Sequence, residues 1–325
     1  MSENILKNSL VIRPKKTGHV SDIVIKQLID EIGYNKIPII KNYYFQINKV
    51  ISRFDRLFQF FFGKLSFESP LIFLNGDWKL NVPYIFYQSK IKILWTYDLW
   101  EPLYAHYEEM IVRFKINILF SSNKKSVDHF NSRQIDGLIC CWIPEGVNTC
   151  HYQSDIPISK RKIDVMQFGR KWDDYHERIK DELNANKVTH LYEEKKGDII
   201  FQSEKLFLEG LGNTKISICI PSNITHPERS GSISTVTNRY LQSFSSKNIV
   251  LGIEPDEMKF LFNYTPIIPI DFENPVDQIL NILSNTEYYN EMVERNYNET
   301  KINHQWKNRI KMVDHFLNQY MQSKY

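Results

Sequence analysis

Residues 163–171 read Ile-Asp-Val-Met-Gln-Phe-Gly-Arg-Lys, a short apolar run that ends in a glycine and two basic residues. A run of this length bounded by glycine is typical of a buried strand and the turn that follows it. Similar runs recur downstream, at Ile216–Ile220 and Ile249–Gly252, with amphipathic segments between them. This alternation is typical of βαβ units, so we expect a parallel sheet covered by helices.

The same alternation extends along the whole chain. In the first half we expect strands at Ser9–Ile12, Ile37–Ile40, Leu71–Leu74, Ile91–Trp95, Ile116–Phe120 and Leu138–Ile143, and helices at Asp22–Ile32, Ile47–Phe62, Glu101–Phe114 and Lys124–Arg133. In the second half we expect further strands at Val188–Tyr192 and Ile267–Ile270, and helices at Asp173–Leu183, Ser203–Leu211, Ser234–Ser245, Asp256–Phe262, Val276–Leu283, Glu287–Asn303 and Trp306–Met321. The pattern predicts two Rossmann-like α/β domains, 1–150 and 151–303, and a closing helix, 304–325, that packs back on the first. Ligands of such sheets bind beyond the carboxyl ends of the strands, so a cleft between the two lobes is the expected site.

Composition sets broad limits on the protein's class. The 325 residues have a formal net charge of +3, and residues 1–150 hold 19 Lys and Arg against 14 Asp and Glu. A mildly basic first half suits an anionic partner, such as a phospholipid surface or a diphosphate-linked acceptor, although random surface drift explains it as well. The four cysteines lack CxxC spacing, and the sequence has neither a secretory leader nor an apolar run of about 20 residues. We therefore expect a cytoplasmic protein.

Four motifs follow one another between residues 142 and 252. They are Trp-Ile-Pro-Glu-Gly-Val-Asn at 142–148, the Gly-Arg turn at 169–170, Ile-Cys-Ile-Pro-Ser at 218–222, and Thr-Asn-Arg-Tyr-Leu-Gln at 237–242, before the strand that ends at Gly252. In this order they resemble the GT-B glycosyltransferases, in particular the group-1-like bacterial polysaccharide and lipopolysaccharide transferases. The resemblance implies two Rossmann-like lobes, with a nucleotide sugar bound by the second and an acceptor by the first. In this chain Gln242 stands where the family usually has a ribose-binding Glu, and Glu145 stands where its turn has Asn.

Transfer from a nucleotide sugar requires compensation of the charge on the leaving diphosphate. No two aspartates stand two residues apart, so no Asp-x-Asp metal motif is present, and we expect no metal and no cofactor beyond a UDP- or GDP-sugar co-substrate. Side chains and helix-start amides would then meet the phosphates and the sugar. The candidates are Gly169, Arg170, Lys171, Glu228, Ser230, Gly231, Ser232, Thr237, Asn238, Arg239 and Gln242. A solvated turn at Arg170 and an ordinary capped helix start at 237–239 are the alternative interpretations.

Two positions in the first half are candidates for the chemistry on the acceptor. Gly18 and His19 follow the first expected strand, where a glycine-containing loop would approach the sugar, and His19 titrates in the range a general base needs. Asp98 follows another strand and is a candidate catalytic carboxylate, with a helix N-cap for Glu101–Phe114 as the alternative. Retention or inversion of the anomeric configuration stays open.

The segment Asn48–Leu65 carries four basic residues and seven Phe or Leu side chains. As a helix it would offer a basic, aromatic surface for peripheral contact with a membrane, which would favour a lipid-linked acceptor. Because the apolar residues nearly encircle such a helix, a buried helix is the competing interpretation.

The sequence thus predicts a metal-independent glycosyltransferase that acts on a surface-glycan or lipid-linked acceptor. Phosphate-loop and serine-nucleophile motifs are missing. Three alternatives remain: a nucleotide-sugar epimerase of the same fold, a non-catalytic transferase-like binding subunit, and a transferase acting on DNA. Nucleic acid is not an expected partner, since the basic first half is the only support for it.

Overall fold

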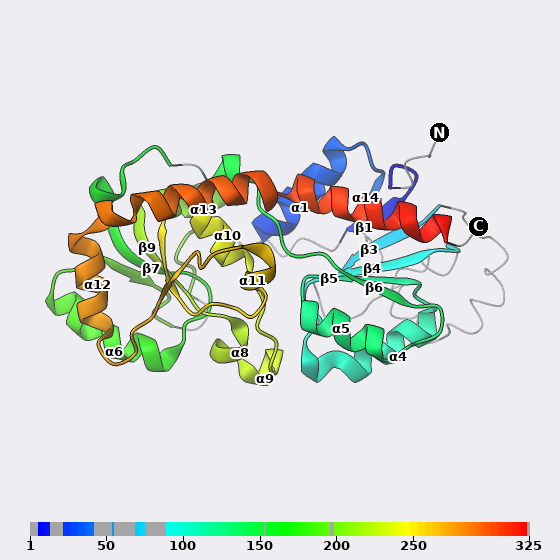
Figure 1. Ribbon diagram of the computed structural model, residues 1–325, viewed down its shortest axis with the longest axis horizontal. Coiled ribbons are helices and arrows are strands. Elements are labelled where there is room, and N and C mark those ends of the chain that lie inside the picture. The colour runs from blue at the N-terminus through cyan, green and yellow to red at the C-terminus, as the bar shows by residue number, and fades with distance from the viewer. Residues whose placement is uncertain are drawn as a thin grey trace. The chain divides into compact units, whose positions relative to one another are not determined.

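The structure is a computed structural model, and it describes residues 6–13, 22–41, 54, 69–75, 89–152, 154–195 and 198–323. The chain forms two compact units (Figure 1). The first unit comprises residues 1–19, 28–144 and 309–325, and the second comprises residues 20–27 and 145–308. Neither unit is a single contiguous segment.

The first unit is built on a parallel sheet with the strand order β2-β1-β3-β4-β5-β6. Its strands are β1 (Leu10–Arg13), β2 (Ile39–Lys41), β3 (Leu71–Asn75), β4 (Lys92–Thr96), β5 (Ile118–Ser121) and β6 (Ile139–Trp142). All five pairings are parallel, with registers such as Leu94 opposite Leu119. Every residue of β5 is buried, as expected for a strand with helices on both faces.

Helices cover both faces of this first sheet. One core joins strand residues such as Leu94 and Leu119 to the buried side chains of α4 (Tyr104–Phe114) and α5 (Lys124–Ser132). On β5 the alternate residue Phe120 contacts Phe316 of α14 (Trp306–Gln322), with ring centroids 5.5 Å apart. Helix α1 (Asp22–Tyr34) buries Leu28 and Ile32. Because successive side chains of a strand point to opposite faces of the sheet, each face is covered by its own layer of helices.

The second unit holds a five-stranded parallel sheet with the order β11-β10-β9-β7-β8. Its strands are β7 (Ile163–Gln167), β8 (His190–Tyr192), β9 (Thr214–Cys219), β10 (Ile249–Gly252) and β11 (Ile268–Pro269). Counted within the unit this is the doubly wound order 2-1-3-4-5, in which the first and third strands are neighbours.

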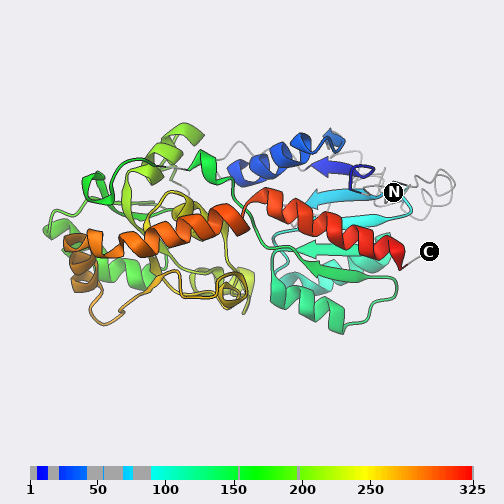
Figure 2. The same cartoon turned by 45° about the horizontal axis from the view of Figure 1, so that its top comes forward.

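Two separate cores lie on the two faces of this second sheet. One packs Met166, Cys219 and Val250 against α7 (Glu204–Gly212), α10 (Asn238–Ser245) and α11 (Met258–Leu261). The other packs Val165, Ile218 and Leu251 against α6 (Asp173–Ala185), α12 (Pro275–Ser284) and the start of α13 (Asn290–Asn303). Short turns complete the unit: η4 (Thr149–His151), η5 (Ile158–Lys160), α8 (Ser222–Thr225), α9 (Pro227–Ser230) and η6 (Thr286–Tyr289). The long α13 and the following α14 are drawn in orange and red in Figure 2.

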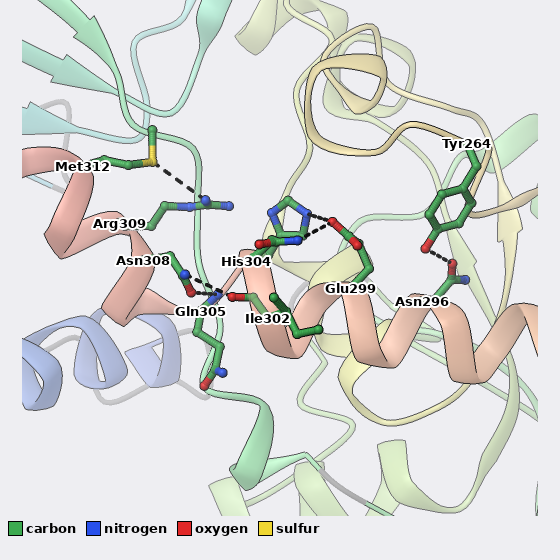
Figure 3. Close-up of polar contacts among 10 residues, drawn as sticks. Tyr264, Asn296, Glu299, Ile302, His304, Gln305, Asn308, Arg309 and Met312 are labelled. Atoms are coloured by element: carbon green, nitrogen blue, oxygen red, sulfur yellow. Dashed lines mark hydrogen bonds and ion pairs between the residues drawn. The ribbon is translucent and has the colours of Figure 1, made fainter.

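Two of the segments that leave the second unit are paired with each other inside it. Val147 forms an isolated parallel bridge with Gln305, in which Val147 N donates to His304 O (3.1 Å) and Trp306 N donates to Val147 O (3.3 Å). The turn between α13 and α14 is closed by Asn308, whose amide nitrogen donates to Ile302 O at 3.0 Å (Figure 3). A Cβ at Gly146 would lie 2.9 Å from the Trp306 ring, so glycine is needed there for the close approach.

The expected strands and helices are confirmed within the described residues, with differences at some of the ends. The largest shift concerns the helix predicted from Ser234, which begins at Asn238. Its first residues are held outside the helix by Glu257, whose carboxylate accepts from Thr235 Oγ1 (2.5 Å) and Val236 N (3.2 Å). The helix expected at Ile47–Phe62 falls almost entirely outside the described residues. Only Phe54 of this stretch is described.

Candidate functional site

The strand order of the second unit creates one topological switch point. The chain leaves β7 toward β8 on one side and leaves β9 toward β10 on the other. The connections that follow β7 and β9 therefore diverge at the carboxyl ends of these two strands, which is where ligands of such sheets bind. The residues at that place are Gly169 and Arg170 after β7, and Pro221 and Ser222 after β9.

Gly169 and Arg239 fix the geometry of the first of these loops. Gly169 has φ +77°, a left-handed conformation that favours glycine, and a Cβ there would lie 3.3 Å from Cδ of Arg239. Arg239 donates from Nη1 to Arg170 O and from Nη2 to Ile220 O, both at 3.0 Å. The guanidinium thus ties the carboxyl end of β7 to that of β9. Two of its donors serve the backbone, while its positive charge stays at the switch point.

The two basic residues after Gly169 have different surroundings. Lys171 donates from Nζ to Glu193 O at 2.5 Å, and the same atom lies 4.9 Å from the centroid of the Tyr192 ring. Its charge is therefore held at the end of β8. Arg170 is half-buried, and within the described part of the chain its guanidinium has no hydrogen-bond or ion-pair partner. Of the two, Arg170 is the cation left available for an anionic ligand.

The start of α10 holds a carboxylate from elsewhere in the chain. Asn238 N donates to Glu145 Oε2 at 2.7 Å, and the Asn238 side-chain amide donates to the same oxygen. Thr237, the N-cap residue, makes no side-chain capping bond. The predicted phosphate position at this helix start is thus occupied by Glu145, a contact across 93 residues that sequence motifs did not predict.

Several buried polar atoms around this helix start and after the end of β9 have no hydrogen-bond partner in the part of the chain that the structure describes. On the β9 side these atoms are Ser222 Oγ, Asn223 Oδ1, Thr225 Oγ1 and His226 Nδ1, and on the α10 side they are Thr237 Oγ1 and Asn238 Oδ1. Ser222 and Asn238 are only 3% and 8% exposed, so solvent does not compensate for the missing bonds. Buried polar groups are nearly always paired in folded proteins, and a group left over needs a ligand or a water to satisfy it. Ser222 to His226 were missed as site candidates; the signal was a polar run directly after a strand and Pro221.

The residues predicted around Gly231 divide into buried and exposed positions. Ser230 is fully buried and donates from Oγ to His226 O at 3.0 Å, which closes the turn of α9. Gly231 ends α9 with φ +59°. Glu228 and Ser232 are exposed. Contact of these four residues with a sugar or phosphate stays a prediction.

Gln242 belongs to a buried polar network. Its amide nitrogen donates to Tyr152 Oη at 3.0 Å, and Gln27 donates to the same oxygen at 3.1 Å. Gln27 Oε1 also accepts from Asn148 N at 2.9 Å. Burial raises the pKa of Tyr152 to about 12, so the phenol stays protonated at neutral pH. The amide nitrogen of Gln242 is therefore engaged in holding α10 to the segment after Asn148, and its contact with a ribose stays a prediction.

In the first unit, Asp98 is the one predicted site residue that the structure describes. It lies half-buried after the carboxyl end of β4, and its carbonyl accepts from Trp100 N at 2.9 Å. The alternative N-cap interpretation is wrong, because the helix begins as a 3₁₀ turn, η3 (Glu101–Leu103), whose cap residue is Trp100. Gly18 and His19 lie outside the described residues. A catalytic role for Asp98 stays a prediction.

The described residues contain neither a cluster of metal ligands nor a membrane-spanning helix. Across the described ranges, no three His, Cys, Asp or Glu side chains gather in a way that could hold a metal ion. Among the helices described, none is both long and apolar enough to cross a bilayer. Of the segment 48–65 only Phe54 is described, with 57% of its surface exposed, so contact with a membrane stays a prediction.

The fold is shared with solved glycosyltransferase structures. No family model and no curated protein matches the chain. The Anabaena protein HepE, crystallised with UDP and glucose, matches with a TM-score of 0.64 at 9% identity, over 96% of this chain and 99% of that one. Sucrose-phosphate synthase from Thermosynechococcus elongatus matches at 0.55 and 8% identity, over 97% and 99%. A glycosyltransferase from Rickettsia africae matches at 0.51 and 10% identity, over 96% and 98%. With two parallel α/β lobes and these structural relatives, the chain has the GT-B fold.

Proposed function

We propose that the protein is a glycosyltransferase that moves a sugar from a nucleotide-sugar donor to an acceptor, with the donor bound by the second unit. The observation that carries the proposal is the group of polar atoms near the switch point, from Ser222 to His226 and at Thr237 and Asn238, together with the guanidinium of Arg170, for which the described residues offer no partner. A sugar diphosphate supplies both hydroxyl groups and negative charge, which these groups are suited to bind.

The fold supports this class of ligand. HepE, which has the same fold, was crystallised with UDP, with UDP-glucose, and with UDP and glucose. In an open α/β sheet a nucleotide binds outside the carboxyl ends of the strands at the switch point, which here lies between β7 and β9. UDP-sugars are therefore the first donors to test, and GDP-sugars the second.

The chemistry follows from the charges at this place. As the bond from the sugar to the diphosphate breaks, negative charge grows on the leaving phosphate. Arg170 would donate charge-assisted hydrogen bonds to it, and Arg239 would add a positive charge fixed by its two bonds to Arg170 O and Ile220 O. In this proposal the protein's own cations take the role that a metal ion has elsewhere.

The finer assignments are also proposals. The reaction would be hexosyl transfer in the biosynthesis of a surface polysaccharide or lipopolysaccharide, in the cytoplasm or at the inner face of a membrane. The first unit would bind the acceptor, with Asp98 or His19 as the base that takes the proton of the acceptor hydroxyl.

The experiment is a thermal-shift and calorimetry panel of UDP-, GDP-, CMP- and dTDP-sugars, each with EDTA and with added Mg²⁺. We expect one nucleotide series to raise Tm and to bind equally well under both conditions, and we expect slow release of free sugar from the bound donor. Binding without any release or transfer would favour the non-catalytic subunit. Binding that requires Mg²⁺ would contradict the metal-independent mechanism, and absence of binding across the panel would contradict the proposal as a whole.

A further inference from the structure

Glu145 is placed where it would compete with a ligand. It is the first residue of the second unit after the chain leaves the first unit at Pro144. Its Oε2 accepts two hydrogen bonds from Asn238, one from the backbone N–H at 2.7 Å and one from the side-chain amide. Asn238 opens an eight-residue helix, and the N-terminus of a helix attracts anions through its free N–H groups and its dipole.

The polar atoms beside this contact indicate a site that Glu145 fills only in part. Asn238 is only 8% exposed, and its Oδ1 has no hydrogen-bond partner among the described residues. The neighbouring Thr237 Oγ1 is also buried and unpaired. Glu145 therefore satisfies the N–H donors of Asn238 and leaves a hydroxyl and an amide oxygen unsatisfied. A ligand that carries both an anion and hydroxyl groups would satisfy more of these atoms than the carboxylate does.

We infer that Glu145 is an internal competitor for the phosphate of the donor, and that it lowers the affinity of the resting protein for nucleotide diphosphates. The inference rests on the proposed function. In the absence of ligand the carboxylate occupies Asn238 N, and a diphosphate must displace it to bind there. Because both are anions, the two cannot share one N–H donor without strong repulsion. The contact between Glu145 and Asn238 thus raises the concentration of nucleotide sugar that is needed to saturate the site.

The test compares Glu145→Gln with the wild-type full-length chain. Glutamine keeps an oxygen that can accept from Asn238 N, but it removes the negative charge. The matched control is Asp271→Asn. Asp271 is another carboxylate of the second unit that accepts backbone N–H groups before a helix, from Glu273 N at 2.9 Å and Asn274 N at 3.0 Å ahead of α12. The probes are UDP and inorganic pyrophosphate, and the readout is Kd by calorimetry.

We expect Glu145→Gln to bind both probes about 2- to 5-fold more tightly, and at most about 30-fold, which are the fold-changes that an anion at a helix start is worth. Asp271→Asn should keep the wild-type Kd. In the wild type, the Asn238 amide resonance should shift when UDP is added, as Glu145 leaves it.

Two results would overturn the inference while leaving the proposed function intact. One is equal Kd for wild type and Glu145→Gln, which would make Glu145 a helix cap alone. The other is weaker binding by Glu145→Gln, which would place Glu145 among the groups that hold the ligand. If neither probe binds to the wild type or to the variant, both the inference and the proposed function fail.

Discussion

The two ends of the second sheet each hold an arginine in a very different setting. At the amino end, Arg161 is 3% exposed and makes four hydrogen bonds, to Ile156 O (3.1 Å), Thr214 O (2.7 Å), Lys247 O (3.0 Å) and Asn248 Oδ1 (2.7 Å). At the carboxyl end, Arg170 is half-buried and, among the residues described, has no partner for its guanidinium. The first arginine is fully used by the fold, and the second is left over.

This difference separates a group that stabilises from a group that can bind. A buried donor already paired with carbonyls gains little from a ligand, whereas an unpaired charge among unpaired polar atoms gains much. Burial lowers the pKa of Arg161 to about 10, which still leaves it charged at neutral pH. We therefore expect substitutions at the amino end of the sheet to lower stability, and substitutions at the carboxyl end to weaken ligand binding.

The largest effect is expected at the amino end. Arg161→Met keeps the length of the side chain but leaves three carbonyls and the Asn248 amide oxygen unpaired in a buried place. We expect a loss of about 3 kcal/mol in the free energy of unfolding. Urea denaturation measures this loss of stability. The control is Lys162→Met, which changes the exposed neighbouring residue. Affinity for UDP in the folded variant should not change; a large loss of affinity there would break the division.

At the carboxyl end we expect the reverse pattern. Arg170→Gln should leave the free energy of unfolding within about 0.5 kcal/mol of the wild type, since no described partner is lost. It should weaken UDP binding by roughly tenfold, the value of one charge-assisted hydrogen bond. Calorimetry measures the affinity, and Arg178→Gln, an exposed arginine stacked on Phe272, is the control. A Kd equal to that of the control would remove Arg170 from the site.

At Gly169 we expect a substitution to have a smaller effect on both stability and UDP binding. Gly169→Ala places a Cβ at φ +77° and 3.3 Å from Cδ of Arg239. We expect a loss of about 1 kcal/mol from backbone strain, and a few-fold weaker binding of UDP because Arg239 must move. Thermal denaturation with and without UDP measures both quantities. Unchanged affinity together with lowered stability would mean that the hydrogen bonds of Arg239 to Arg170 O and Ile220 O have a structural role alone.

The smallest effect on stability at neutral pH is expected for a cluster of hydrogen-bonded side chains at the end of β7, formed by Gln167, His176 and His190. Gln167 Oε1 accepts from both His176 Nδ1 (2.6 Å) and His190 Nε2 (3.0 Å). Burial lowers the pKa of His176 to about 4 and that of His190 to about 3. In the unfolded chain an imidazole takes up its proton near pH 6.5, so protonation favours unfolding below that pH.

The stability contributed by these neutral histidines is therefore complete above about pH 6.5 and is lost as the pH falls toward 4. Urea titrations across this range should give a smaller loss of stability for His176→Gln than for the wild type. Parallel curves for the two proteins would mean that His176 is protonated at similar pH in both states.

Most of the fold could be predicted because it depends on local patterns. Strand β10 lies at the predicted residues 249–252, and the other described strands differ from their predicted bounds at the ends. The start of α10 could not be predicted in the same way. It depends on a hydrogen bond from Thr235 to Glu257, 22 residues further along the chain, and local propensity contains no trace of it.

The candidate site was predictable in its position but not in its contacts. The Gly-Arg turn after β7 placed Gly169 and Arg170 at the switch point, since glycine after a strand and parallel topology are both visible in sequence. The roles of Lys171 and Glu145 were not visible. Lys171 reaches the end of β8, and Glu145 reaches a helix start 93 residues away, and both contacts require the folded arrangement of distant segments.

The bridge between Val147 and Gln305 bears on how the second lobe can be produced alone. A recombinant fragment of residues 151–303 would lack both partners of that bridge and the Trp306 ring against Gly146. A fragment of residues 145–308 would restore them, but Asn148 and Tyr152 would still lack Gln27, which lies in the sequence between two segments of the first unit, 1–19 and 28–144. Residues 20–27 are joined to that fragment through the other unit alone, so a fragment of the second unit that keeps all its contacts calls for a fusion of residues 20–27 to residues 145–308.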